Sequence, residues 1–158
     1  MFGARQNSIS NRVANEVASL LRHDLVTPIN LIVGYCDLLT GEMIELGETE
    51  LLAQLRTIRS FGFILLGLID QALLTDQPDR SVTDLQILAQ ALCGPATALV
   101  RTCDVLSDST RREPRREDFD DDLQKIRSAG LQMIEMADLL AQGQIPEANN
   151  GSRFPVND

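Results

Sequence analysis

The sequence is poor in aromatic and basic residues. Only 4% of its 158 residues are aromatic, Trp is absent and there is a single Tyr, so the stacking surfaces that hold single-stranded nucleic acid are hard to build. Fourteen Lys and Arg stand against 23 Asp and Glu, which gives a net charge of -9, the wrong sign for a protein that binds a phosphate backbone. We therefore predict no nucleic-acid partner.

Long hydrophobic runs are also missing. The longest apolar run with almost no charge, Phe61 to Ile69, is much shorter than the roughly 20 residues that a bilayer-spanning helix needs. The first seven residues lack the continuous apolar segment of a secretory signal. These features predict a cytoplasmic protein that does not insert into a membrane.

Cysteine and histidine are too few for a metal centre. Cys36, Cys93 and Cys103 lie within apolar helical patterns and form no C-x-x-C pair, so we expect them to be reduced and buried. One histidine without a thiol cluster cannot complete a zinc site. We predict no metal and no cofactor in this chain.

What the sequence has in abundance is the hydrophobic spacing of α-helices. Apolar residues recur at steps of three and four over four segments, and no stretch alternates with period two. The predicted helices run from Val13 to Leu39 with Ser8 or Ser10 as cap, from about Glu48 to Leu73, from near Thr83 to Leu106, and from about Asp118 to Ala141. The expected fold is an all-α, antiparallel four-helix bundle over residues 8–142, followed by a mobile tail or linker over 143–158.

An internal duplication relates the two halves of the chain. After a shift of 67 residues, the matched pairs are Leu21 and Leu88, Leu25 and Leu92, Pro28 and Pro95, Val33 and Val100, Cys36 and Cys103, Asp37 and Asp104, and Leu39 and Leu106. After a shift of 68, Leu55, Ile58, Arg59, Ser60, Gly62 and Asp70 match Leu123, Ile126, Arg127, Ser128, Gly130 and Asp138. Helix interiors usually exclude proline, so its recurrence at one register is unlikely by chance. We predict two tandem hairpins, 8–75 and 82–142, packed as an intramolecular pseudo-dimer, an arrangement compatible with a monomer.

The only histidine, His23, is the candidate for chemistry. On a helix, Leu21 and Leu25 point to the core. His23 and Thr27, four residues apart, share a more exposed face. A neutral imidazole is a nucleophile near pH 7; Asp24 beside it can orient the ring, and Thr27 can position a water molecule. A surface histidine beside a proline kink is the simpler interpretation when such a histidine has no further context.

The residues that follow His23 supply that context. From His23 the sequence is H-D-L-V-T-P-I-N, then L-I-V-G-Y-C-D-L-L, and it resembles the H-box helix of the dimerisation and phosphoacceptor domain of sensor histidine kinases. That family's pattern is roughly H-[ED]-L-[RK]-[TS]-P-L-[TN]-x-I-x-G-[YF]-x-[ED]-L-L. The agreeing residues are His23, Asp24, Leu25, Thr27, Pro28, Gly34, Tyr35, Leu38 and Leu39. The resemblance covers about residues 13–74 strongly and, through the duplication, the second hairpin more weakly.

The resemblance implies a phosphohistidine on His23, formed by in-line phosphoryl transfer. Asp24 is similar to the acidic neighbour that assists the transfer. Thr27 is similar to the polar residue that, with Asp24, supports hydrolysis of a partner's aspartyl phosphate. Val26 departs from the pattern, because the family usually has a basic residue there, and this puts phosphatase tuning and partner contacts in doubt.

The second half has lost these groups. Opposite His23, Asp24 and Thr27 stand Gln90, Ala91 and Gly94. An amide or a methyl group cannot accept and return a phosphoryl group. One chain then carries one active site instead of two, and we predict that the second half serves as a scaffold.

No ATP-binding part is evident in the sequence. Only 17 residues follow Ala141, and there is no Gly-rich phosphate loop. We therefore expect a histidine phosphotransferase of a two-component phosphorelay that is not an ATP-dependent kinase on its own. Its partner would be the aspartate of a response regulator receiver domain, whose bound magnesium neutralises charge during the transfer.

The predicted docking surface lies below His23, on the face made by the first two helices. Nearby, Phe61, Phe63 and Leu66 are expected to pack mostly in the core, with some exposed. Two other interpretations remain open. A catalytically silent adaptor would dock a receiver domain, or serve as the N-terminal regulatory domain of a larger signalling protein. A purely structural bundle would explain the packing pattern but not the H-box. Phosphotransfer requires an exposed His23.

Overall fold

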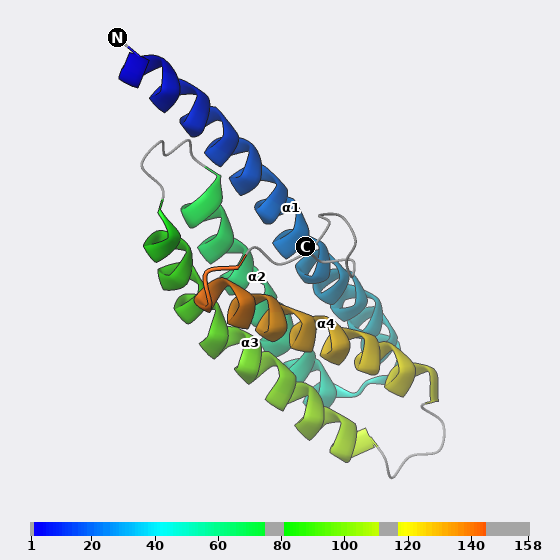
Figure 1. Ribbon diagram of the computed structural model, residues 1–158. Coiled ribbons are helices and arrows are strands. Elements are labelled where there is room, and N and C mark those ends of the chain that lie inside the picture. Colours follow the sequence, from blue (N-terminus) through cyan, green and yellow to red (C-terminus); the bar gives the residue numbers. More distant parts are fainter. Residues whose placement is uncertain (1, 75–80, 111–116, 145–158) are drawn as a thin grey trace.

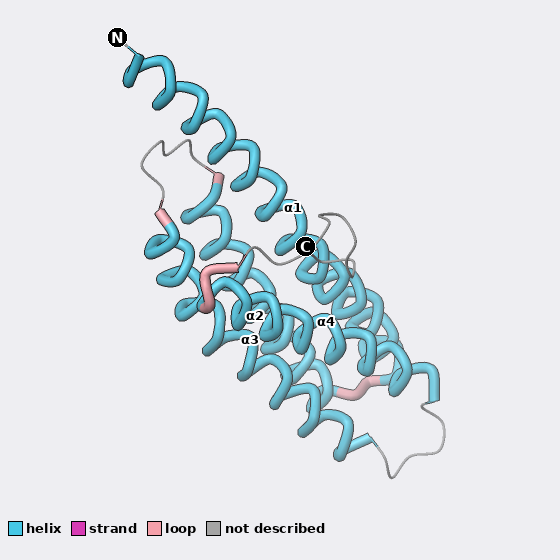
Figure 2. Tube along the Cα trace, viewed as in Figure 1, coloured by secondary structure: helices cyan, strands magenta, loops and turns pink. Residues whose placement is uncertain are grey.

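The four predicted helices are present in the computed structural model (Figure 1), which describes residues 2–74, 81–110 and 117–144, with side chains from residue 16 onward except at 117. They are α1 (Phe2–Leu46), α2 (Thr49–Leu73), α3 (Val82–Thr110) and α4 (Glu117–Ala141). The described residues contain no strand (Figure 2). The all-α class predicted from the hydrophobic spacing is confirmed.

The prediction that the first helix begins near Val13 is wrong. Helix α1 begins at Phe2. Ser8 and Ser10, the predicted caps, lie inside the helix instead of at its start. In Figures 1 and 2 the first turns of α1 extend past the ends of the other helices. Because few apolar residues precede Val13, the hydrophobic spacing that predicted the helix carries no information about these turns.

The other end of α1 also lies further along the chain than predicted. The helix continues past Leu39 to Leu46. It stops at Gly47, whose φ of 71° is a conformation that glycine adopts without steric cost. This turn lets the backbone N–H of Glu48 donate to the carbonyl of Met43 at 3.0 Å, as in a Schellman motif. The short connection returns the chain immediately into α2.

Helix α3 begins with a reciprocal cap. The backbone N–H of Ser81 donates to Asp84 Oδ2 at 2.9 Å, and the N–H of Asp84 donates to Ser81 Oγ at 3.2 Å. Such a capping box satisfies two backbone donors at a helix start. The helix ends at Thr110, beyond the predicted Leu106. Most of the predicted loops and tail, at 75–80, 111–116 and 145–158, lies outside the described residues.

Two ion pairs show that α1 and α2 run in opposite directions. Arg22 NH2 lies 2.7 Å from Asp70 Oδ1, and Arg59 Nε donates to Asp37 Oδ1 at 2.7 Å. A residue later in α1 therefore pairs with a residue earlier in α2, as in two antiparallel helices. Helix α1 packs against α2 and α4, and α3 packs against the same two helices. The predicted four-helix bundle is confirmed.

The core contains the apolar stripe of each helix. Leu21 and Leu25 are buried on α1, as predicted. The largest fully buried side chains are Leu21, Leu25, Ile29, Ile32, Leu39, Met43, Leu55, Ile58, Leu65, Ile69, Leu92 and Leu99. Burying such side chains is worth about 1.5 to 3 kcal/mol each relative to exposure. The core therefore anchors the stretch of α1 that carries His23.

The three cysteines are free, as predicted. Cys36 and Cys103 are buried, whereas Cys93 is only half-buried. Burial raises the pKa of both Cys36 and Cys103 to about 12, and the nearby carboxylates of Asp37 and Asp104 contribute further. The two buried thiols are therefore protonated and unreactive at neutral pH.

Helix α2 is, among the described helices, the one that is long and apolar enough to cross a membrane by length and composition alone. In this structure it packs between α1 and α3 and buries seven residues: Leu51, Leu55, Ile58, Gly62, Leu65, Ile69 and Leu73. The structure contains no membrane, so the absence of membrane insertion stays a prediction.

Candidate functional site

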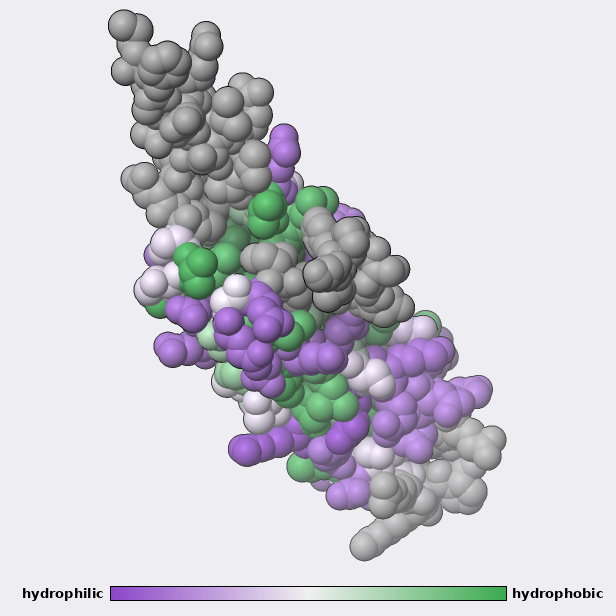
Figure 3. Space-filling model, in the orientation of Figure 1, coloured by the Kyte–Doolittle hydropathy of each residue, from purple (hydrophilic) through white to green (hydrophobic). Residues whose placement is uncertain are grey.

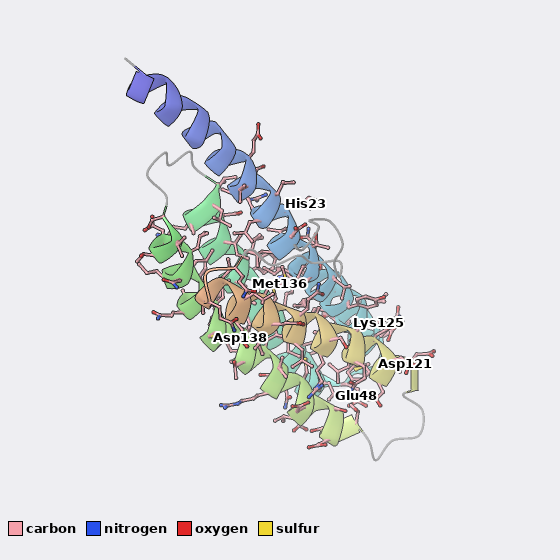
Figure 4. All side chains as sticks on the ribbon, in the orientation of Figure 1. His23, Glu48, Asp121, Lys125, Met136 and Asp138 are labelled. Carbon is pink, nitrogen blue, oxygen red and sulfur yellow. The ribbon has the colours of Figure 1, made fainter. Side chains whose placement is uncertain are left out.

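His23 lies on the outward face of α1. Leu21 and Leu25 on either side of it are buried, and on a helix a residue two positions from each of them is turned away from the core. The His23 side chain is 74% exposed, and Figure 4 shows its place on α1. The ring is therefore open to a molecule that approaches from solvent, which is the condition that phosphotransfer requires.

Asp24 is buried beside the exposed ring. Its side chain is 3% exposed, and its Oδ1 lies 3.4 Å from His23 Nδ1. When Nδ1 carries the proton and directs it at this carboxylate, the lone pair of the ring lies on Nε2. A carboxylate at this distance also stabilises the positive charge that the ring gains when Nε2 forms a new bond. In this tautomer, Nε2 is the ring nitrogen that can act as a nucleophile.

Thr27 lies on the same exposed face, one helical turn after His23. Its hydroxyl donates to the carbonyl of His23 at 2.8 Å, a bond that Thr commonly makes to the preceding turn of a helix. The bond fixes the hydroxyl near the backbone and leaves its oxygen as an acceptor. The structure thus brings together the three predicted residues, with His23 and Thr27 exposed and Asp24 buried.

An ion pair that the sequence reasoning did not single out lies next to the site. Arg22 contacts Asp70 Oδ1 through both Nε and NH2, each at 2.7 Å. The bond joins α1 to the last turns of α2 directly beside His23. In the second half Asp138 matches Asp70, but Ala89 stands where Arg22 would be. The mismatch of Arg22 with Ala89 within an otherwise matched register is the sequence signal that could have pointed to the pair.

The second half presents the same surface position without reactive groups. Gln90 and Gly94 are exposed, as their counterparts His23 and Thr27 are. Ala91 is exposed, whereas Asp24 is buried. None of these three groups in α3 can bond to phosphorus and later release it. Of the two matched positions, only the one on α1 therefore carries an imidazole.

No family model, no curated protein and no solved structure matches the chain. In the part of the chain that the structure describes, no three His, Cys, Asp or Glu side chains gather as a metal site. The likeness to histidine kinases rests on the H-box residues around His23.

Apolar side chains also reach the surface near the site. Phe61 and Leu66 are half-buried and pack against the core, as expected for most of this segment. Phe63 is exposed, with the Arg59 guanidinium 4.7 Å from the centre of its ring, a favourable cation–π contact. On the face that Figure 3 shows, apolar patches lie between hydrophilic residues.

Proposed function

We propose that this chain is a histidine phosphotransfer module of a two-component signalling system. It exchanges phosphate between His23 and the aspartate of a response regulator receiver domain. The observation that carries the proposal is an exposed imidazole whose Nδ1 faces the buried carboxylate of Asp24 at 3.4 Å. A nucleophile oriented by a third group in this way is typical of covalent catalysis.

The reaction needs no ATP-binding element in this chain. The lone pair of His23 Nε2 attacks the phosphorus of the partner's aspartyl phosphate in line. A nitrogen–phosphorus bond forms as the phosphorus–oxygen bond breaks, and the aspartate leaves with the bonding electrons. The Nδ1–H stays directed at Asp24, which stabilises the positive ring. Magnesium bound by the receiver would neutralise charge on the phosphoryl oxygens.

Thr27 fits the reverse task of removing phosphate from the partner. Its hydroxyl oxygen lies at the surface, one turn from His23. A water molecule held between this oxygen and the imidazole would be placed to attack an aspartyl phosphate bound at His23. Here Asp24 acts through the ring as a positioning residue. The module would then act as a histidine phosphotransferase and, with Thr27, as a phosphatase.

The proposal includes a pseudo-dimer of two tandem hairpins with one active site. It is supported by an ion pair that recurs between matched positions: Arg59 with Asp37 at 2.7 Å, and Arg127 with Asp104 at 2.6 Å. One chain thereby supplies the scaffold that two identical hairpins would supply in a dimer. We expect a cytoplasmic protein, and the pseudo-dimer is compatible with a monomer.

The decisive experiment uses receiver domains carrying radiolabelled aspartyl phosphate. A panel of them is incubated with the wild-type chain and with His23→Ala. We expect label on the wild type that is labile in acid and stable in alkali, as a phosphoramidate is, and none on His23→Ala. Label that persists on the variant contradicts the role of His23.

The same experiment separates phosphotransfer from the adaptor interpretation. Tight binding of a receiver without any transfer of label would identify a catalytically silent adaptor. Asp24→Asn gives a finer measurement, because the amide keeps the shape and removes the charge. We expect a loss of about 10²-fold in transfer rate, typical for removing a group that assists proton placement or charge stabilisation.

A further inference from the structure

Arg22 places a positive charge next to the reactive ring. It precedes His23 directly on α1, and its side chain is 32% exposed. Between residues 16 and 46 of α1 it is the only Lys or Arg. Arg59 of α2 is bound at Asp37, which follows His23 by 14 residues or about 21 Å along a helix. In this stretch of α1, a positive charge for a group on His23 can come only from Arg22.

The other charges placed at the ring are negative. Asp24 Oδ1 lies 3.4 Å from His23 Nδ1, and Asp70 of α2 contacts Arg22. A phosphoryl group carries nearly two negative charges at neutral pH. Like charges at short range repel each other, so a phosphoryl group on Nε2 is more stable with a cation beside it.

The contact between Arg22 and Asp70 is one that a phosphoryl group can replace. Arg22 Nε and NH2 both lie 2.7 Å from a single oxygen, Asp70 Oδ1. The strongest arginine–carboxylate pairs have two parallel bonds to two oxygens, and this pair does not. Both side chains are partly open to solvent, where ion pairs contribute little. A phosphoryl group offers three acceptor oxygens to the same planar guanidinium.

The second half of the chain keeps the carboxylate and lacks the arginine. Asp138 of α4 matches Asp70, and Ala89 of α3 matches Arg22. Asp138 is exposed and makes no ion pair among the described side chains. The arginine is therefore present in the half that has the imidazole of His23 and absent from the half that has none.

The other pair between α1 and α2 follows a different rule. Arg59 joins Asp37 at 2.7 Å, and in the second half Arg127 joins Asp104 at 2.6 Å. A bridge that only holds two helices together is thus present in both halves. The arginine beside the ring occurs once, so it accompanies the chemistry of the site and not the packing of the helices.

We propose that Arg22 is the phosphoryl-binding residue of the site. When His23 is phosphorylated, the guanidinium leaves Asp70 and binds the phosphoryl oxygens. This inference rests on the proposed phosphotransfer at His23. Asp70 then holds the arginine in the resting site and competes with the phosphoryl group for it. The exchange also opens one of the two ion pairs that join α1 to α2 among the described side chains.

The test measures how long His23 keeps its phosphate when no partner protein is present. Radiolabelled phosphoramidate, a small donor, phosphorylates the full chain. His23 Nε2 bonds to phosphorus, the phosphorus–nitrogen bond of the donor breaks, and ammonia leaves with the bonding electrons. The donor is then removed, and the decay of the acid-labile label gives the half-life.

Three variants change the proposed contact and two serve as controls. Arg22→Gln removes the cation, Arg22→Lys keeps the charge without the planar fork, and Asp70→Asn weakens the competing partner. Arg59→Gln breaks the other pair between α1 and α2, away from the ring. Asp138→Asn changes the matched carboxylate that has no arginine.

We expect Arg22→Gln to shorten the half-life about two- to fivefold, the range that an exposed ion contact contributes. The phosphoryl group loses negative charge as it departs in a metaphosphate-like transition state, so a cation stabilises the bound state more. Asp70→Asn should lengthen the half-life about twofold, with Arg22→Lys between wild type and Arg22→Gln. Both controls should decay as the wild type does.

Salt gives a second readout. Between about 0.1 M and about 1 M salt, screening shortens the reach of exposed charges from about 10 Å to about 3 Å. The wild-type half-life should fall toward that of Arg22→Gln, and the half-life of Arg22→Gln should change little. A wild-type half-life that does not respond to salt contradicts an exposed ionic contact.

The opposite signs of two variants separate this inference from a structural role. Loss of a merely structural ion pair acts in the same direction from either side, so equal shortening in Arg22→Gln and Asp70→Asn overturns the inference. An unchanged half-life in Arg22→Gln, or equal shortening in Arg59→Gln, also overturns it and leaves phosphotransfer at His23 standing. A folded wild type that takes no label from phosphoramidate or from any receiver overturns the proposed function, and this inference with it.

Discussion

The hairpin of α1 and α2 and the hairpin of α3 and α4 differ least where helices touch and most where they face solvent. The buried residues Leu25 and Cys36 of α1 are matched by the buried residues Leu92 and Cys103 of α3. Outside these contacts, an imidazole on α1 is matched on α3 only by the amide of Gln90. Packing tolerates few replacements in a close-packed interior, whereas an exposed position can lose its chemistry without cost to the fold.

The largest effect is expected from a substitution that removes the difference in chemistry between the halves. His23→Gln gives α1 the residue that α3 carries at Gln90. We expect acid-labile label from phosphoramidate to fall at least 10²-fold, because an amide nitrogen does not bond to phosphorus under these conditions. The free energy of unfolding should change by less than about 0.5 kcal/mol, since the side chain is on the surface.

The control for this prediction is Gln90→Ala, which should leave labelling unchanged. Label that survives in His23→Gln would show that another residue accepts phosphate. Circular dichroism of both variants checks that the helices are retained.

The second prediction tests whether the matched thiols Cys36 and Cys103 have equivalent buried surroundings in the two halves. Unfolded cysteines ionise above about pH 9, whereas the pKa of Cys36 and Cys103 in the fold is about 12. Their contribution to stability is therefore full below pH 9 and is lost as the pH rises toward 12. We expect the free energy of unfolding to fall by about 1 to 2 kcal/mol per thiol between pH 8 and pH 10.5.

Urea unfolding at the two pH values measures this change. In Cys36→Ala and in Cys103→Ala, the loss of unfolding free energy between the two pH values should be smaller by similar amounts. Both thiols are desolvated by burial at positions that the duplication matches. A fall that only one of the two variants reduces would contradict an equivalent environment in the two halves.

A third prediction separates two glycines that the duplication matches. A Cβ added at Gly130 would lie 2.9 Å from both Leu99 Cδ2 and Val100 Cγ2, whereas at Gly62 the nearest atom, Val33 Cγ2, is at 3.3 Å. Alanine gains up to about 1 kcal/mol over glycine in helix propensity. Overpacking costs about 1 to 3 kcal/mol. We expect Gly130→Ala to destabilise the bundle and Gly62→Ala to be nearly neutral.

Chemical denaturation of the two variants provides the comparison. Gly130→Ala should be less stable than Gly62→Ala by about 1 kcal/mol or more. Equal stabilities would mean that α3 and α4 separate as easily as α1 and α2 when a methyl group is inserted.

The smallest effect concerns the recurring ion pairs. Asp37→Asn and Asp104→Asn each break one pair between exposed side chains. Surface pairs contribute about 0 to 1 kcal/mol, so we expect two equal losses below 1 kcal/mol that shrink further in high salt. Thermal unfolding at two salt concentrations measures them. Unequal losses would indicate different packing around the two pairs.

The sequence was sufficient for features that each helix encodes alone. Four helices were predicted from apolar spacing, and the exposure of His23 followed from the buried positions of Leu21 and Leu25. The ends of α1 were missed at both sides. Its start contains few apolar residues, and its end depends on the positive φ of Gly47, a conformation that hydrophobic spacing does not detect.

Contacts between helices were much harder to predict. The duplication showed that Asp37 matches Asp104 and that Arg59 matches Arg127. It did not show that Asp37 and Arg59, 22 positions apart, form an ion pair with each other. The Arg22–Asp70 pair beside the site, and the burial of Asp24, depend on the axial offset and rotation of neighbouring helices. The helical repeat defines which residues share a face of one helix. It does not define how far neighbouring helices are shifted or rotated relative to one another.

The sequence by itself determined that four amphipathic helices would pack together and that a lone imidazole would lie outside their core, because apolar periodicity is a local property. Only the tertiary structure decided that Asp24 is buried beside the ring and which side of α1 is bridged by ion pairs. Those features arise from side chains of different helices, and their separation is fixed only when all four helices pack at once.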